Sequence, residues 1–134
     1  MAKSMSHKAL DAAFEHIASR AEFLVLCAGV PTSAAEAVTP AGEGGRMLGR
    51  AVMVPGLNNG DFAVAAGAVS GRRLVVNGRI GMAVLASGLA DHLALVARRT
   101  DEVLLVTALA EPCEVIEGGT VAVCGFSSEI ADPA

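Results

Sequence analysis

The sequence predicts a mainly β fold: an antiparallel β-sandwich, jelly-roll-like or immunoglobulin-like, with one N-terminal α-helix. Short apolar segments alternate with Gly, Asn and Pro turn signals at spacings of roughly 8–12 residues, and no helix-length pattern lies between them. A single amphipathic segment near the N-terminus predicts the helix. At 134 residues, the chain has the length of one domain with one core.

The stretch from Ser87 to Leu109 predicts a hairpin in the middle of a sheet. Two apolar runs, residues 92–97 and 103–109, flank the charged residues 98–102. Each run is too short and too rich in Val and Leu to favour a helix. Because apolar side chains occupy both faces of each strand, we expect this hairpin to be covered on both sides.

We expect a single domain over residues 1–134, with an N-terminal arm at 1–6, a helix at 7–20 and a β-sandwich at 22–130. Ser6 is a suitable N-cap for the helix. The expected buried face of the helix recurs at helical spacing and consists of Leu10, Ala13, Phe14, Ile17 and Ala21.

Apolar runs between turn residues predict further strands at residues 22–28, 50–54, 61–69, 72–76 and 80–86. Ser33 and Glu36 have the spacing of a capping box and predict one short helical turn. Four Gly and one Pro between residues 39 and 49 predict a long loop.

The pairing register of the last predicted hairpin follows from its glycines. If Gly118 and Gly119 form a two-residue turn, Cys113 lies opposite Cys124. Alternation from the turn makes this a hydrogen-bonded pair, in which the side chains are less close. The chain has three Cys, an odd number, and we expect a cytosolic setting, so two buried thiols are favoured over a disulfide.

Composition and charge narrow the functional classes. Ten Lys and Arg against 14 Asp and Glu give a net charge of −4, which leaves no basic footprint for nucleic acid or for an anionic membrane. No apolar run reaches the ~18 residues of a membrane span, and the N-terminus predicts no signal peptide. The chain also lacks Trp and Tyr, the side chains that commonly stack on bases or sugars.

The sharpest catalytic hypothesis combines Cys27, Asp91 and His92 as nucleophile, orienting group and base. Asp91 and His92 are consecutive on a predicted strand and so should point to opposite faces, and a thiol in an apolar run is usually inert. A zinc site on His92, Cys113 and Cys124 lacks any Cys-x-x-Cys or His-x-His pair. We therefore predict no catalytic, cofactor-binding or metal-binding residues and no cofactor. The acidic residues interpreted as solvated turn and edge positions are Asp61, Asp91, Asp101, Glu102 and Glu114.

Several short segments occur in a characteristic order along nearly the whole chain. They are residues 8–14, 32–37, 70–74, 87–96 with its Ser-Gly-x-Ala-x-His-x-Ala-Leu pattern, 104–107, 118–121 and the tail 126–133. In this order the chain resembles a widespread group of small uncharacterised structural proteins of tailed bacteriophages and prophages. It departs from the group's pattern at Leu89 and Asp91, where the group has Thr.

The resemblance implies a non-enzymatic structural protein of the virion, assembled in the host cytoplasm and present in many copies. A capsid decoration or cement subunit is the favoured role, and a tail or head–tail (neck) accessory protein is the alternative. A β-sandwich module that binds a ligand or glycan is the alternative of another class. The implied partners are the major capsid protein or other virion subunits and further copies of the chain as a homo-oligomer, with no nucleic acid and no membrane.

Overall fold

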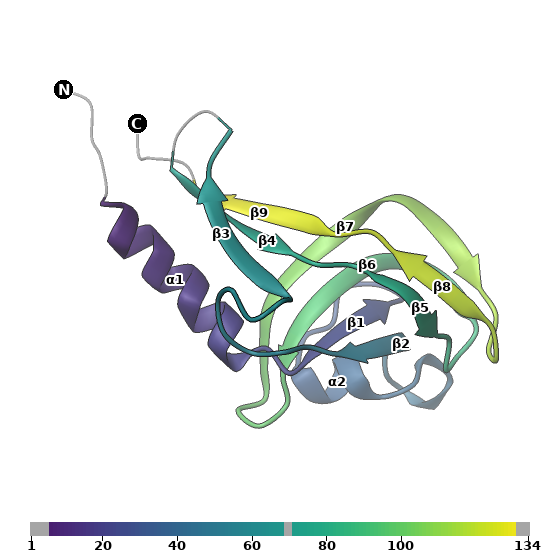
Figure 1. The fold of residues 1–134 in the computed structure, drawn as a ribbon. Coiled ribbons are helices and arrows are strands. Elements are labelled where there is room, and N and C mark those ends of the chain that lie inside the picture. The colour runs from purple at the N-terminus through teal and green to yellow at the C-terminus, as the bar shows by residue number, and fades with distance from the viewer. Residues whose placement is uncertain (1–5, 69–70, 131–134) are drawn as a thin grey trace. The chain divides into compact units, whose positions relative to one another are not determined.

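A computed structural model of the protein describes residues 6–68 and 71–130 (Figure 1). The predicted N-terminal arm, residues 1–6, lies outside these residues apart from Ser6. The chain divides into two compact units. Unit 1 contains the described residues within Met1–Arg20, Val54–Gly78 and Cys124–Ala134, and unit 2 consists of Ala21–Met53 and Arg79–Val123. The division into two compact units does not test whether the chain is a single domain, so that expectation stays a prediction.

The predicted fold class is confirmed, because the chain is mainly β and β-sandwich-like, with antiparallel sheets and the N-terminal helix α1 (His7–Arg20). The short helices are α2 (Ala34–Val38) and η1 (Ala41–Glu43). The strands are β1 (Phe23–Cys27), β2 (Met47–Val52), β3 (Phe62–Ala66), β4 (Arg72–Val76), β5 (Arg79–Ala83), β6 (Gly88–Ala97), β7 (Glu102–Val115), β8 (Thr120–Val123) and β9 (Phe126–Ile130). Within the described ranges, no helix is both long and apolar enough to cross a membrane.

Unit 2 is built on a four-stranded sheet in the order β2-β1-β6-β7. The antiparallel pairing of β6 with β7 confirms the hairpin predicted within residues 87–109, and Figure 1 shows both strands as long and curved. β6 lies between β1 and β7, and every side chain from Leu93 to Ala97 is buried. The expected burial of both faces is therefore confirmed for β6. It is wrong for β7, which lies at the edge of the sheet with half-buried side chains from Val103 to Thr107, so the hairpin is not in the middle of the sheet.

The helix α2 packs against residues of this sheet in a core of small side chains. Its Ala34 and Ala37 are buried in one cluster with Val25, Cys27, Met47, Ala94 and Val96. Ser33 Oγ caps the helix by accepting a hydrogen bond from Glu36 N at 3.1 Å. The short helical turn predicted from Ser33 and Glu36 is confirmed.

The long loop predicted over residues 39–49 is wrong in its last part. β2 begins at Met47, and both Met47 and Leu48 are buried. A Cβ on Gly49 would lie 2.8 Å from the carbonyl oxygen of Ala83 in β5. Glycine at this position therefore allows the backbones of β2 and β5, which belong to different sheets, to approach closely. The glycine content of this segment had predicted a loop.

The last predicted hairpin is also wrong, because β8 pairs with β5 and not with β7. A tight turn does form, but one residue earlier than predicted: Gly119 N donates to Ile116 O at 3.0 Å, so Glu117 and Gly118 are its central residues, with Gly118 at φ +91°. However, Gly118 N donates to Val84 O at 3.0 Å, and Val84 N donates to Gly119 O at 2.9 Å. These two bonds direct the chain after the turn towards β5.

The surroundings of Cys113 and Cys124 follow from this change of strand partner. Cys113 lies opposite Ala90 in β6, so the predicted pairing with Cys124 does not occur. Cys113 and Cys124 are both free thiols, as favoured, but both are exposed instead of buried. The expectation of buried thiols assumed the hairpin register, which the structure contradicts.

Unit 1 consists of the three-stranded sheet β3-β4-β9 and α1, which contacts β3 and β4. Phe62 lies opposite Val76, and Val76 lies opposite Phe126. Arg72 on β4 forms an ion pair with Asp11 on α1, with Arg72 Nε 2.9 Å from Asp11 Oδ1. Because side chains alternate along a strand, the even-numbered residues of β4 face α1.

The bounds predicted for α1 are confirmed, and so is its cap, because an amide of the first turn donates to Ser6 Oγ at 3.2 Å. The buried stripe, however, consists of Leu10, Phe14 and Ala18, while Ala13 is exposed. Residues four apart lie one above the other on a helix, so this spacing forms a narrower stripe than the predicted one.

Candidate functional site

The side chains of Asp91 and His92 are in contact in unit 2, contrary to the prediction that they point to opposite faces. His92 Nδ1 donates to Asp91 Oδ1 at 2.8 Å. The register between β6 and β7 shifts between Ala90 and His92, so Asp91 lies in an irregular segment of the strand. A bulge interrupts the alternation of faces, and that is why the prediction failed.

Cys27 also belongs to this neighbourhood, because it lies directly opposite His92 across the β1–β6 pair. The three residues of the catalytic hypothesis are therefore brought together. The thiol is fully buried, and burial followed by the charge of Asp91 raises the pKa of Cys27 to about 12. Because the thiolate is the nucleophile, this cysteine stays in its unreactive protonated form.

Asp91 has a structural role as the link between β6 and the loop after β1. Its Oδ1 accepts a second hydrogen bond, from Gly29 N at 2.7 Å. The hydrogen bond from His92, and next that from Gly29, lower the pKa of Asp91 below its usual range. A carboxylate with two such donors holds His92 in one orientation and fixes the path of the loop.

A second group of polar side chains lies beside this dyad. Arg46 Nε donates to Glu36 Oε1 at 2.6 Å, and Arg46 Nη1 donates to Ala28 O at 3.1 Å. Glu36 also accepts a hydrogen bond from Thr32 Oγ1 at 3.0 Å, and the bond from Arg46 is the largest cause of its lowered pKa. Gly29, at φ +88°, gives Arg46 its room, since a Cβ there would lie 2.5 Å from Nη1.

These contacts form a connected polar cluster that ties the β1–α2 loop to β2 and β6. Within residues 6–68 and 71–130, no group of three or more His, Cys, Asp or Glu side chains is arranged to hold a metal ion. Chemically, the cluster offers an oriented imidazole beside a protonated thiol. Its observed contacts stabilise the loop, which is a structural use of these residues.

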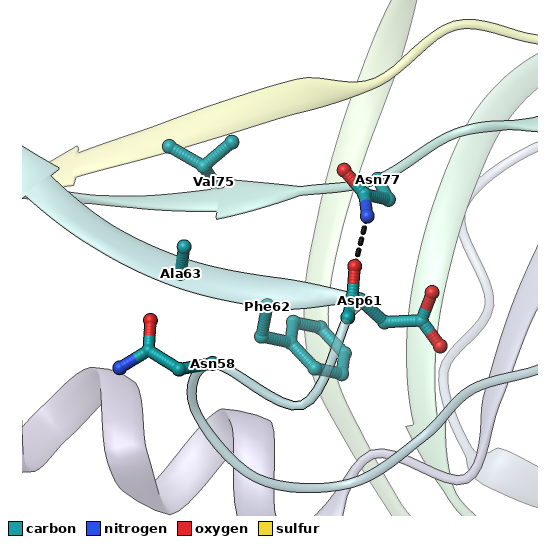
Figure 2. Close-up of a pocket in the computed structure, with 7 residues that line it drawn as sticks. Asn58, Asp61, Phe62, Ala63, Val75 and Asn77 are labelled. Carbon is teal, nitrogen blue, oxygen red and sulfur yellow. Dashed lines mark hydrogen bonds between the residues drawn. The ribbon is translucent and has the colours of Figure 1, made fainter.

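Unit 1 contains a shallow hollow of about 240 Å³, shown in Figure 2. It is lined by Asn58, Gly60, Asp61, Phe62, Ala63, Val75 and Asn77. Ala63 and Val75 point to the same side of the sheet, and Phe62 points to the side where α1 lies. The Asn77 side chain donates to Gly60 O. Asn58 has φ +62°, a left-handed conformation that asparagine tolerates better than most residues.

Asp61 in this hollow corrects one interpretation of the sequence. It was expected to be a solvated turn residue, but it is only 8% exposed. Its Oδ2 accepts a hydrogen bond from Val54 N at 2.6 Å, and its carbonyl oxygen accepts one from Asn77 N at 2.9 Å. The buried carboxylate thus supports the loop that precedes β3.

A second hollow of about 290 Å³ shares Val75 and Asn77 with the first. Its other lining residues are Arg73, Val76, Gly125, Phe126 and Ser127. Sequence reasoning named none of these as site residues. The alternation of side chains along 72–76 was the available signal, since it separates Arg73 and Val75 from the buried Leu74.

Comparison of the chain with protein-family models, curated proteins and solved structures found no match. The structural support for any hypothesis about function therefore comes from the polar cluster, the two hollows and the exposed surface of the described residues.

Proposed function

We propose that the protein is a non-enzymatic structural subunit of a bacteriophage virion, most specifically a decoration or cement subunit of the capsid. The phage assignment derives from the resemblance of its ordered segments to small phage and prophage proteins. The structural support is a set of large aliphatic side chains left exposed on unit 2. In a repeated particle, a neighbouring copy or the major capsid protein would cover them.

The most exposed of these side chains lie along the β5–β8 pair. Ile80 in β5 is 92% exposed, and Ile116, just before the turn into β8, is 75% exposed. Leu85 is also exposed and follows Val84, which exchanges backbone hydrogen bonds with the glycine turn. Leu85 and Ile116 therefore flank one junction just beyond the end of β5, while Ile80 lies near its start.

The edge strand β7 is a second surface suited to assembly. It is 14 residues long and lies at the edge of its sheet, with half-buried side chains from Val103 to Val106. An edge strand presents backbone groups with which another chain can pair. The register shifts at Leu104 and between Ala108 and Cys113 interrupt this edge. Such bulges restrict pairing with unrelated strands, so a specific neighbour is favoured.

The proposal is tested on particles induced from the strain that encodes the chain. Mass spectrometry of purified virions should detect the intact protein in many copies. Replacing the exposed aliphatic pair, Ile80→Ser with Ile116→Ser, should reduce its incorporation by about tenfold, because repeated contacts of modest affinity multiply in a particle. Val54→Ser removes a half-exposed aliphatic side chain of unit 1, away from the β5–β8 pair, and is the control.

The circular dichroism spectrum of the double variant should equal that of the unchanged protein, so that reduced incorporation reports binding and not unfolding. If the protein is a stable monomer that is never found on particles, the proposal is wrong. Full occupancy by the double variant would show that β5 is not the contact surface.

A tail or head–tail accessory protein is the close alternative, since exposed aliphatic side chains suit any repeated assembly. Electron microscopy of virions labelled through the protein would distinguish the two roles, because a decoration subunit covers the head and an accessory protein clusters at the neck or tail.

A module that binds a ligand or glycan is favoured by one observation, the pair of Asn side chains in the hollow of Figure 2. Amide groups commonly donate and accept hydrogen bonds in sugar sites. A glycan array probed with the purified protein would support this alternative if binding disappeared in Asn58→Ala.

A further inference from the structure

Two consecutive arginines on β4 have opposite surroundings. Arg72 faces α1, where its Nε and Nη2 lie 2.9 Å and 3.4 Å from the two carboxylate oxygens of Asp11. Arg73 faces the other side of the sheet, between Ala65 on β3 and Glu129 on β9. Its Nε is buried and has no hydrogen-bond partner among the described residues. The guanidinium of Arg72 thus has hydrogen-bond acceptors, whereas Nε of the neighbouring Arg73 has none among the described residues.

Glu129 occupies the position opposite Arg73 on β9, but among the described residues it makes no hydrogen bond to Arg73 Nε. Its Oε1 accepts a hydrogen bond from Ala68 N, which draws the carboxylate towards the β3 end of the sheet. A buried guanidinium nitrogen without a partner is unfavourable, because it has lost water without gaining a hydrogen bond. A ligand that accepts from this nitrogen would restore the missing interaction.

The space beside Arg73 has the composition of a small binding site. Arg73 lines the hollow of about 290 Å³ together with the side chains of Asn77 and Ser127, which can donate hydrogen bonds. Of the other lining residues, Val75 shares the face of Arg73, whereas Val76 and Phe126 lie opposite each other on the face that meets α1. One cation, two polar groups and the apolar side chain of Val75 fit a carboxylate carried on a short aliphatic stem.

We propose that this hollow binds a carboxylate group through Arg73. The planar guanidinium matches a carboxylate with two parallel hydrogen bonds, and the side chain of Val75 can contact the attached carbon atoms. The carboxylate can come from a free short-chain acid or from an Asp or Glu side chain of a second copy of this chain. The proposal is independent of the virion role.

The test follows the Nε–H resonance of Arg73 by NMR during titration of the full chain with sodium propionate. Sodium chloride at equal ionic strength is the reference. The resonance is assigned by its disappearance in Arg73→Gln. We expect a saturable shift with propionate only, which leaves the Nε–H resonance of Arg72 unchanged. Arg73→Lys keeps the positive charge but removes the planar guanidinium that makes two parallel hydrogen bonds. It should weaken propionate binding at least tenfold, as measured from the chemical-shift changes of the backbone amides of residues 125–127.

Arg98→Gln, at the exposed hairpin tip, is the matched control and should bind propionate normally. Equal shifts with propionate and chloride, or no shift with either, would overturn the proposal. Binding that appears only in Glu129→Gln would also overturn it, because Glu129 would then occupy the guanidinium itself. A shift of the amides of residues 125–127 on concentrating the protein alone, lost in Arg73→Gln, would identify a second copy as the source. Its absence beside propionate binding would identify a free acid.

Discussion

Unit 2 and unit 1 use antiparallel pairing in different ways. In unit 2, β6 is paired along both edges, and five consecutive side chains, Leu93 to Ala97, are buried. In unit 1 each of the three strands has five residues, and buried Leu74 and Val76 alternate with half-buried neighbours. Unit 2 therefore depends on both faces of a central strand, whereas unit 1 depends mainly on the face that meets α1.

The polar side chains differ in the same way. In unit 2, Asp91 satisfies two donors inside a connected network. In unit 1, Arg72 has its carboxylate and Arg73 has none. Comparison of the two units teaches that the network around Asp91 in unit 2 is paired within the fold, while unit 1 leaves one buried guanidinium nitrogen without a hydrogen-bond partner among the described residues.

Thiol reactivity should show the largest contrast. Cys27 of unit 2 is buried with a pKa of about 12, whereas Cys124 of unit 1 and Cys113 are exposed. At pH 8 a pKa of about 12 leaves roughly one thiol in ten thousand ionised, so Cys27 should react at least about a hundredfold more slowly with Ellman's reagent. Denaturation without reductant should release three free thiols. Only one titratable thiol would show that the other two had been oxidised.

The core of unit 2 should be the part most sensitive to truncation. Leu95→Ala removes a fully buried side chain from the central strand and should lower the free energy of unfolding by roughly 3 kcal/mol. Val75→Ala removes a half-buried side chain from unit 1 and should cost about 1 kcal/mol or less. Urea denaturation measures both. Equal losses would contradict the contrast between the two sheets.

Asp91→Ala should lower the free energy of unfolding by about 1–2 kcal/mol, because Gly29 N and His92 Nδ1 lose their acceptor. The pKa of Asp91 is lowered in the folded protein, so its contribution is present above the unfolded pKa of about 4 and is lost as the pH falls through the folded value. The difference in stability between the unchanged protein and the variant should therefore start to shrink below about pH 4 and disappear once the pH is below the folded pKa. A constant difference down to pH 2 would exclude this origin.

The helix caps allow a finer comparison. Ser33→Ala removes the cap of α2 in unit 2 and should cost about 1 kcal/mol, because Glu36 N loses its partner. Ser6→Ala should cost less, because its exposed 3.2 Å bond lies at a helix end that water can reach. Thermal denaturation followed by circular dichroism compares the two variants.

The smallest effect is expected at the ion pair of unit 1. Asp11→Asn removes the partner of Arg72, but both side chains are partly exposed, so the loss should stay below about 1 kcal/mol. It should shrink further in 1 M salt, where exposed charges are screened. A larger loss that does not depend on salt would mean that this pair is as essential to unit 1 as Asp91 is to unit 2.

The features predicted correctly are those set by local pattern. The caps at Ser6 and Ser33, the bounds of α1 and the β6–β7 hairpin all follow from residues close together in the sequence. The partner of β8 could not be predicted in this way. The glycine turn is compatible with pairing of β8 to either β7 or β5, and the hydrogen bonds between the turn and Val84 favour β5.

The polar contacts were less predictable than the strands. The contact of Asp91 with His92 depends on an irregularity opposite β7, which neither residue reveals by itself. Arg73 Nε has no hydrogen-bond partner among the described residues because the Glu129 carboxylate accepts a hydrogen bond from Ala68 N instead. Both features arise from contacts between distant segments, which periodicity does not encode.

The strand order of unit 1 has a consequence for synthesis on the ribosome. β4 pairs with β3, which precedes it, and with β9, which follows only after β5, β6, β7 and β8 have been made. The nascent chain therefore carries one open edge of β4 while four later strands emerge. Non-local pairing of this kind forms late and leaves an edge exposed to wrong partners. Unit 2 has all its strands once β8 has emerged, so it is the unit able to complete its sheets first.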